Sequence, residues 1–177
     1  VTVEDTIPPT LVCQDVTVYL DSNGTASGMQ NPFINGALVS QSDNCSTVGG
    51  VGQTGGSVSC STLGPVTRTI FQDDPSGNQT SCTYTLTTLD TIGPVVSCQD
   101  LTVYLDASGN ASISSTDLND GSTDNCSIAS YVASDTTFNC SEIGANTITL
   151  TVTDGSGNSS TCTSTVTVVD TVSPIAS

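Results

Sequence analysis

Hydrophobic and polar residues alternate in several short stretches of this 177-residue chain. The clearest stretches are "LTVYLD" (101–106), "TITLTVTD" (147–154) and "STVTVVD" (164–170), and turns rich in Gly, Asn, Asp and Ser separate them. Alternation with a period of two places every second side chain on one face of a β-strand, whereas an amphipathic helix repeats every three or four residues. We therefore expect these apolar residues to face a core: Leu101, Val103, Leu105, Ile148, Leu150, Val152, Val166 and Val168.

The whole pattern occurs twice along the chain. "VCQDVTVYLDSNGTAS" (12–27) aligns with "SCQDLTVYLDASGNAS" (97–112). A junction sequence occurs three times, as "VTVEDTIPP" (1–9), "LTTLDTIGP" (86–94) and "VTVVDTVSP" (166–174). Such self-similarity is typical of a segment of a tandem array. The predicted parts are the tail of a preceding repeat (1–4), repeat one (5–89), repeat two (90–169) and the start of a next repeat (170–177).

Composition supports an all-β fold with a core of small residues. Hydrophobic residues make up 35% of the chain, aromatic residues only 4%, and tryptophan is absent. Val and Thr favour strands, while Gly, Asn, Asp and Ser favour turns. The sequence therefore predicts two tandem β-sandwiches of about seven strands each.

The charge of the chain limits its chemistry and its partners. The formal net charge is −16, Arg68 is the sole basic side chain, and Lys and His are both absent. Phosphate groups of nucleic acids and of anionic membranes are bound by Lys and Arg, so we expect neither partner. Catalysis by a Ser-His-Asp or Cys-His arrangement is excluded because there is no histidine, and a Schiff base because there is no lysine. The chain contains no candidate membrane span, and we expect no catalytic site.

Eight cysteines indicate disulfides formed in an oxidising, extracellular setting. No Cys-x-x-Cys pair occurs, which argues against a zinc or thioredoxin-like site. The first and last strands of a sandwich can run side by side, which would pair Cys98 with Cys162 and, by repetition, Cys13 with Cys82. The cysteines that remain would then form Cys45–Cys60 and Cys126–Cys140. Four cysteines per repeat permit three pairings, so the other two stay open.

Acidic residues recur at three places in each repeat: the junction "DT", the "DNC" loop, and the turn before the last strand. Following the strands up and down a sandwich brings these three places to one pole. Carboxylate, amide and backbone oxygens in such numbers suit Ca²⁺, a hard cation that takes six to eight oxygen ligands. We therefore predict Ca²⁺ at the junction pole, between domains, where it would stiffen the junction. The candidate ligands are Asp5, Asp43, Asn44, Asp73 or Asp74, and Asn78 in repeat one, and Asp90, Asp124, Asn125, Asp154 and Asn158 in repeat two.

The alternative is that these residues only build turns, because Asp, Asn and Gly are the ordinary residues of tight turns. Four other aspartates, Asp15, Asp21, Asp100 and Asp106, are better explained as solvated residues of strand ends and turns. Seven Asn-x-Ser/Thr sequons are discounted, since many are expected by chance in a chain of this composition, and three of them have Cys in the middle position.

The chain resembles the hyalin repeat (HYR) family of immunoglobulin-like extracellular modules. The resemblance rests on "D-T-x-x-P" at each junction, a Cys soon after it, "DNC", and "D-x-S-G-N-x-x-x-C" before the last strand. The version with four cysteines is similar to repeats of very large secreted surface proteins of Bacteroidota, such as gliding-motility adhesins and filament-like arrays exported by the type IX route. The resemblance implies immunoglobulin-like sandwiches, a bond between the first and last cysteines, and an extracellular spacer or stalk without catalysis. Its partners would be neighbouring repeats of the same polypeptide and possible glycan or protein targets at a surface.

In that bacterial group, Asp followed by Ser or Thr and an apolar residue can accept an O-glycan, which would make Thr6, Thr91 and Thr171 candidate carriers. Two other functions stay open at this point. One is a module that binds carbohydrate or protein, for which the insertion around Phe33 is the best candidate patch. The other is an accessory module of a secreted hydrolase.

Overall fold

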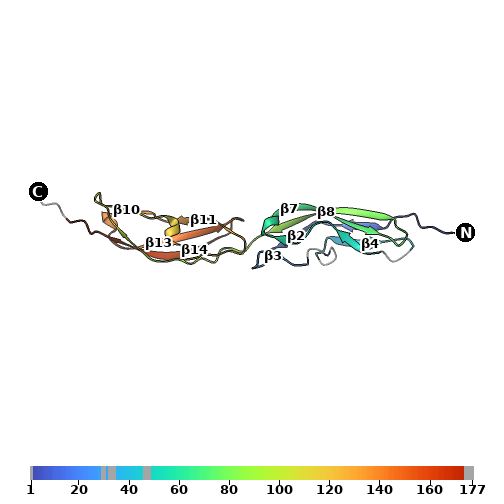
Figure 1. The fold of residues 1–177 in the computed structure, drawn as a ribbon, viewed down its shortest axis with the longest axis horizontal. Coiled ribbons are helices and arrows are strands. Elements are labelled where there is room, and N and C mark those ends of the chain that lie inside the picture. The colour runs from blue at the N-terminus through green and yellow to red at the C-terminus, as the bar shows by residue number, and fades with distance from the viewer. Residues whose placement is uncertain (1, 29–30, 32–34, 46–48, 174–177) are drawn as a thin grey trace. The chain divides into compact units, whose positions relative to one another are not determined.

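The computed structural model describes residues 2–28, 31, 35–45 and 49–173. Phe33 and most of the insertion in repeat one therefore lie outside the described residues. The chain divides into two compact units, with the division after Thr91. Each unit is built of β-strands and short 3₁₀ turns (Figure 1), which confirms the all-β prediction.

The first unit has a four-stranded sheet in the order β2-β8-β7-β5, together with the pairs β1-β4 and β3-β6. Strands β7 and β8 form its long antiparallel hairpin, and β2 runs parallel to β8. The strands are β1 (Thr10–Cys13), β2 (Val16–Tyr19), β3 (Thr25–Ala26), β4 (Leu38–Ser42), β5 (Val51–Gln53), β6 (Val58–Ser59), β7 (Gly64–Asp73) and β8 (Gln79–Leu89). One 3₁₀ turn, η1 (Cys60–Thr62), lies just before β7.

The second unit repeats this arrangement with the sheet order β11-β13-β14-β9 and the pair β10-β12. Isolated bridges, Val95↔Thr123 and Cys98↔Asn119, replace the β1-β4 pair. The strands are β9 (Leu101–Tyr104), β10 (Asn110–Ser112), β11 (Ile128–Ala133), β12 (Thr137–Asn139), β13 (Gly144–Asp154) and β14 (Ser159–Val169). Two 3₁₀ turns, η2 (Ser115–Leu118) and η3 (Cys140–Glu142), complete it.

The core of the second unit contains the residues that the alternating pattern predicted. Six of them are buried, and Leu101 and Val103 are partly buried against this core. Phe138 and Leu118 complete it, although neither belongs to an alternating stretch long enough to be recognised in the sequence. The first unit places polar side chains at two equivalent positions, since Arg68 and Gln72 are buried in β7. The Arg68 guanidinium donates a hydrogen bond from Nη2 to the carbonyl oxygen of Gly56 at 2.9 Å.

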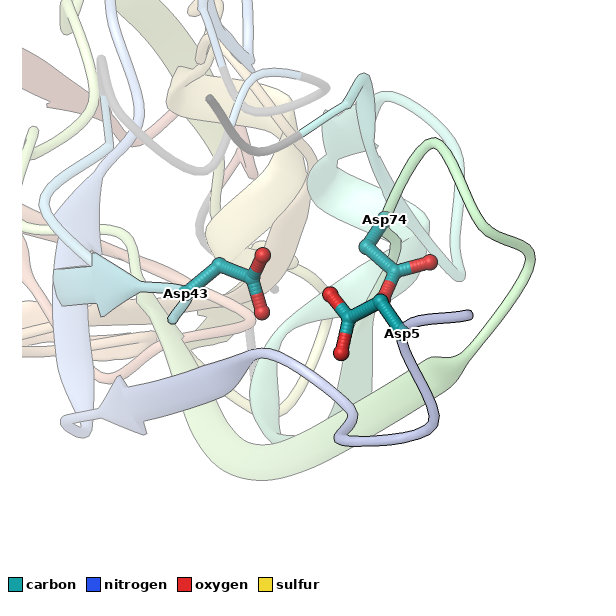
Figure 2. Close-up of side chains that lie close together, drawn as sticks. All are labelled: Asp5, Asp43 and Asp74. Carbon is teal, nitrogen blue, oxygen red and sulfur yellow. The ribbon is translucent and has the colours of Figure 1, made fainter. Parts of the chain in front are cut away.

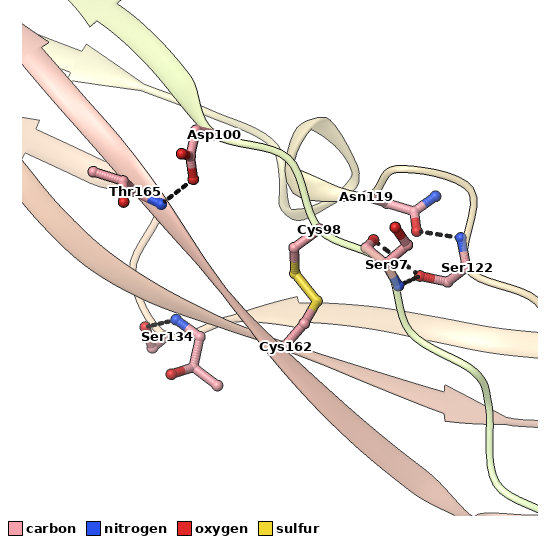
Figure 3. Close-up of a disulfide and its surroundings, with 9 residues drawn as sticks. Ser97, Cys98, Asp100, Asn119, Ser122, Ser134, Cys162 and Thr165 are labelled. Carbon is pink, nitrogen blue, oxygen red and sulfur yellow. Dashed lines mark hydrogen bonds between the residues drawn. A yellow bond between two sulfur atoms is a disulfide. The ribbon is translucent and has the colours of Figure 1, made fainter.

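In each unit, the last strand has a short parallel neighbour from near the start of the unit. Strand β9 pairs with the end of β14, in the register Leu101↔Val166, and β2 pairs with β8 in the same way. A disulfide joins the segments before these pairs: Cys98–Cys162 in the second unit (Figure 3) and Cys13–Cys82 in the first. Both pairings agree with the sequence prediction, because parallel alignment brings the two segments together.

The predicted pairs Cys45–Cys60 and Cys126–Cys140 are not formed. Cys45 and Cys140 are free and exposed, whereas Cys60 and Cys126 are disulfide-bonded. The reason is distance along the sandwich. Cys60 lies in η1 before the first residue of β7, and Cys45 lies at the loop beside the last residues of that strand. Ten residues of extended strand separate the two ends by roughly 30 Å, while disulfide-bonded Cα atoms lie within about 7 Å.

Candidate metal centre

Three aspartates from distant parts of the sequence meet at one end of the first unit. Asp5 precedes β1, Asp43 follows β4, and Asp74 follows β7. Each offers a carboxylate oxygen, and these oxygens lie within 4.8 Å of one another. The three carboxylates point toward one another (Figure 2), and that of Asp74 is buried. This is the convergence that the strand directions predicted.

The turn after β7 fixes Asp74. In "DPSGN" (74–78), the Asp74 and Asn78 backbones are hydrogen-bonded, and Asp74 Oδ1 accepts from the Asn78 N–H at 2.8 Å. The Asn78 side-chain amide donates to Asp74 Oδ2 at 2.7 Å and to the Asp5 carbonyl oxygen at 3.0 Å. Gly77 has φ of +90°, a conformation that side chains disfavour, so the glycine of "S-G-N" is needed to close the turn.

Hydrogen bonds also set the ionisation of Asp74. Burial opposes the charged form, but donation from the Asn78 side chain and from the backbone N–H groups of Asn78, Ser76 and Gly77 outweighs it, so that the pKa of Asp74 is lowered below its ordinary value. Asp74 therefore contributes a negative charge to the group at neutral pH.

The neighbouring Cys45 thiol responds to the same charges. The pKa of Cys45 is raised above its ordinary value. The largest cause is the loss of hydration at the thiol, followed by the charge of Asp5, a hydrogen bond with Asp5, and the charges of Asp43 and Asp74. A negative potential favours the neutral thiol over the thiolate. The carboxylates thus make this end of the first unit electronegative.

The second set of carboxylates has the same construction. Asp90, Asp124 and Asp154 offer oxygens within 4.8 Å of one another, and Asp90 and Asp154 are buried. Asp154 Oδ1 accepts from the N–H groups of Ser156 and Asn158 at 2.9 and 2.8 Å, and Asn158 Nδ2 donates to Asp154 Oδ2 at 2.8 Å. The recurrence of one geometry from two different sequences indicates that the spacing of the motifs, rather than one particular loop, produces it.

Asp124 provides a direct test of whether a cation fits. Its Oδ1 accepts from the N–H groups of Cys126 and Ser127 at 2.9 and 3.1 Å. Its Oδ2 is buried and has no hydrogen-bond partner among the described residues. A buried charged oxygen without a partner is costly unless a cation or water satisfies it. The donor set of three carboxylates, all hard oxygens, fits Ca²⁺ better than a softer transition metal.

The sole basic side chain lies far from Asp74 along the strand. Arg68, the sole basic residue, lies within β7, six residues and about 20 Å of extended strand from Asp74. Like charges gathered in this way repel one another unless a cation enters or protons bind.

The other predicted ligands have different positions. Asp73 is exposed, and its Oδ1 accepts a hydrogen bond from Gln79 Nε2 at 2.7 Å, pointing to the hairpin rather than to the carboxylate group. Asn44 donates its Nδ2 to Asp5 Oδ1 at 3.3 Å. Like Asn78, Asn44 presents an N–H group to a carboxylate, and in this arrangement it orients the carboxylate instead of offering an oxygen. Asn125 directs its Nδ2 toward the Cys126 sulfur at 3.8 Å.

Two of the aspartates that the sequence analysis explained as solvated residues of strand ends and turns have a defined structural role. Asp100 Oδ1 accepts from the Thr165 N–H at 2.6 Å, and Asp15 Oδ1 accepts from the Thr85 N–H at 2.7 Å. Both aspartates follow the sequence "C-Q", and this shared motif was the signal in the sequence that could have indicated a common role. The role itself becomes clear only from the parallel strand pair that each carboxylate extends. The candidate glycan carriers Thr6, Thr91 and Thr171 are all exposed, and their modification stays a prediction.

Comparison with known proteins supports the fold class. The family model of the HYR domain matches residues 89–168, so the part of the chain that contains the second repeat is similar to an HYR domain. No curated protein matches the chain. Among the described residues, no helix is long and apolar enough to span a membrane.

The similar solved structures include two cadherin-type proteins and titin. The first two repeats of human protocadherin-24 are 13% identical, with 94% of this chain and 100% of that chain covered and a TM-score of 0.43. Domains I67–I69 of titin are 9% identical, with 92% of this chain and 66% of that chain covered and a TM-score of 0.43. The first four repeats of Drosophila N-cadherin are 12% identical, with 91% of this chain and 49% of that chain covered and a TM-score of 0.41. At this level of similarity they carry no functional argument, and the fold assignment rests on the strand topology.

Proposed function

We propose that this chain is a load-bearing spacer segment of a long extracellular surface fibre or adhesin. HYR-like, disulfide-bonded modules fit a structural or adhesive role outside the cell. The finer assignment, to large secreted arrays like those of Bacteroidota, with repeats at 5–89 and 90–169, is supported by the "DNC" and "D-x-S-G-N" motifs that both repeats contain.

One observation carries the proposal: in each unit the last strand has a parallel neighbour from near the start of the unit, β2 beside β8 and β9 beside β14, and a disulfide joins the segments just before each pair. Tension applied to the two ends of the second unit passes from Cys98 through the disulfide to Cys162 and then along β14. If the disulfide is reduced, the load passes through β9 instead, and the hydrogen bonds of the parallel β9–β14 pair are then loaded together rather than one at a time. The Cys98–Cys162 bond, which joins positions 64 residues apart in the sequence, keeps the residues between its cysteines from extending. Such a unit transmits tension with little change in length.

Ca²⁺ is part of this proposal. Bound to Asp5, Asp43 and Asp74, it would tie the segment before β1, the loop after β4 and the turn after β7 into one rigid end of the unit. Asp90, Asp124 and Asp154 would hold a second ion in the same manner. The ion would act structurally, by neutralising charge and joining segments.

Single-molecule stretching of the chain tests the load-bearing role. In oxidising buffer, we expect each unfolding event to release only the residues outside the disulfide loop. After reduction, the 69-residue loop closed by Cys13–Cys82 should add about 25 nm of contour length to each event of the first unit. Equal step lengths in both buffers, or unfolding of the oxidised units at negligible force, would contradict the proposal.

A further inference from the structure

Two cysteines, Cys45 and Cys140, are free thiols with exposed side chains. The cysteine at the same position of the other repeat is oxidised in both cases. Cys126 is the counterpart of Cys45 in the "DNC" loop, and Cys60 is the counterpart of Cys140 at the start of a 3₁₀ turn; both are disulfide-bonded. Each free thiol therefore occupies a position at which this fold forms a disulfide.

The local structure around the two loop cysteines is the same. The Cys45 N–H donates to Asp43 Oδ2 at 3.3 Å, and the Cys126 N–H donates to Asp124 Oδ1 at 2.9 Å. In both loops the preceding asparagine directs its amide toward the cysteine sulfur. The loop that presents the oxidised Cys126 thus presents the free Cys45 in the same way.

The two turn cysteines also match. Cys60 begins η1 with its sulfur 3.5 Å from the carbonyl oxygen of Gly24, and Cys140 begins η3 with its sulfur 3.7 Å from that of Gly109. Cys140 faces an open hollow of about 490 Å³ whose wall includes Gly109 and Val172. This hollow leaves room for a loop from another molecule to reach the sulfur.

A bond between the two types of cysteine within one repeat is excluded by their positions. Cys140 lies immediately before β13 and Cys126 lies in the loop beside its last residues, so eleven residues of strand, about 35 Å, separate them. Either free thiol must therefore take its partner from another repeat.

We propose that Cys140 and Cys45 are the two halves of a head-to-tail disulfide, formed between the turn of one repeat and the "DNC" loop of another, as between two copies of this chain. The oxidant is a small-molecule disulfide such as oxidised glutathione. The Cys140 thiolate attacks it, one thiol leaves, and a mixed disulfide remains. The Cys45 thiolate of the second copy then attacks the Cys140 sulfur, and the second thiol leaves. Two thiols of the protein lose two electrons and two protons, and the oxidant gains them.

Complementary single variants test this pairing. C45S and C140S, made with tags of different length, are incubated separately and as an equimolar mixture in a glutathione redox buffer at physiological salt, which screens the acidic ends. We expect each variant alone to remain monomeric and the mixture to form a disulfide-linked mixed dimer, in excess of the one-half share that random pairing would give. Digestion at aspartates should yield a peptide pair that joins Cys140 to Cys45, and C45S/C140S should stay monomeric in every sample.

A tandem fusion identifies the source of the partner. The first copy ends at Val169 and the second begins at Asp5, which restores the junction sequence "VVDTIP". A bond in the fusion but not between separate copies would assign the pairing to successive repeats of one polypeptide, where the effective concentration is high. A Cys140–Cys45 bond both in the fusion and between separate copies would show that the pairing also forms between separate molecules. Dimers of either single variant in amounts equal to the mixed dimer, or no Cys140–Cys45 bond in either arm, would overturn the proposal.

Discussion

Asp100 extends the parallel pairing of β9 and β14 by one hydrogen bond, because its Oδ1 accepts from the Thr165 N–H at 2.6 Å (Figure 3). The backbone ladder begins one residue later, at Leu101↔Val166. The carboxylate thus supplies an acceptor to the N–H group that β9 is too short to reach. Asp15 does the same for Thr85 in the first unit.

Replacing Asp100 should therefore weaken the second unit. We expect D100A to lower the free energy of unfolding by about 1–2 kcal/mol, because the Thr165 N–H loses a charged acceptor and regains only water. Urea unfolding of the variant measures this. D120A is the control, since it removes the same charge from an exposed carboxylate to which the described residues donate no hydrogen bond. Equal losses in both variants would attribute the effect to net charge.

The bonds Cys13–Cys82 and Cys98–Cys162 should contribute most to the stability of the two units. Opening the 64-residue loop in the variant C98A/C162A should lower the free energy of unfolding of that unit by about 4 kcal/mol on the loop-entropy estimate. The matched control is C45S/C140S, which removes two free thiols and should change stability little. A loss below 1 kcal/mol in the disulfide variant, from chemical denaturation curves, would refute this assignment.

Calcium should stabilise the chain against unfolding. With a dissociation constant of 0.1–1 mM, a range typical of extracellular modules, 10 mM Ca²⁺ adds about 1.4–2.7 kcal/mol per site. We expect the melting temperature to rise with Ca²⁺ and to fall again with EGTA. D124N should remove the response of the second unit, while D106N, which changes a turn aspartate outside the group, should keep it. Identical melting in Ca²⁺ and EGTA would leave only the turn-building role for these residues.

Glycine is required at the tip of the "DGSGN" turn. Gly157 has φ of +92°, so G157A strains the backbone although open space surrounds the position. We expect a loss of about 1–2 kcal/mol in stability and, because the turn orients Asp154, a weaker response to Ca²⁺. G155A is the comparison, since Gly155 does not have positive φ. Thermal unfolding with and without Ca²⁺ separates the two effects.

Acid should destabilise the first unit partly through Asp21. Hydrogen bonds from the Thr25 and Asn23 N–H groups, and from the Thr25 hydroxyl, lower the pKa of Asp21 below its ordinary value. A lowered folded-state pKa stabilises the protein above the unfolded-state value, about 3.9, and this contribution is lost as the pH falls through the folded-state pKa. D21N should therefore flatten the fall in stability below pH 4 in metal-free buffer. An unchanged slope in urea titrations would contradict the assignment.

The sequence by itself determined the repeated pattern, the strand character of both units and most of the core of the second unit. Alternation assigned Leu150 and Val166 to the interior because a strand exposes its two faces to different surroundings, and this information is local. The convergence of Asp5, Asp43 and Asp74 was also predictable, because strand direction alone decides which loops share an end of a sandwich.

Only the tertiary structure decided which groups meet at atomic distance. It separated Asp74 from Asp73, which are adjacent in sequence but point to different neighbours across the hairpin. It also placed Cys45 and Cys60 at opposite ends of β7, although a short loop in the sequence made them look like partners. The physical reason is that an extended strand adds more than 3 Å per residue, so a few residues of sequence can carry a side chain from one end of the sandwich to the other.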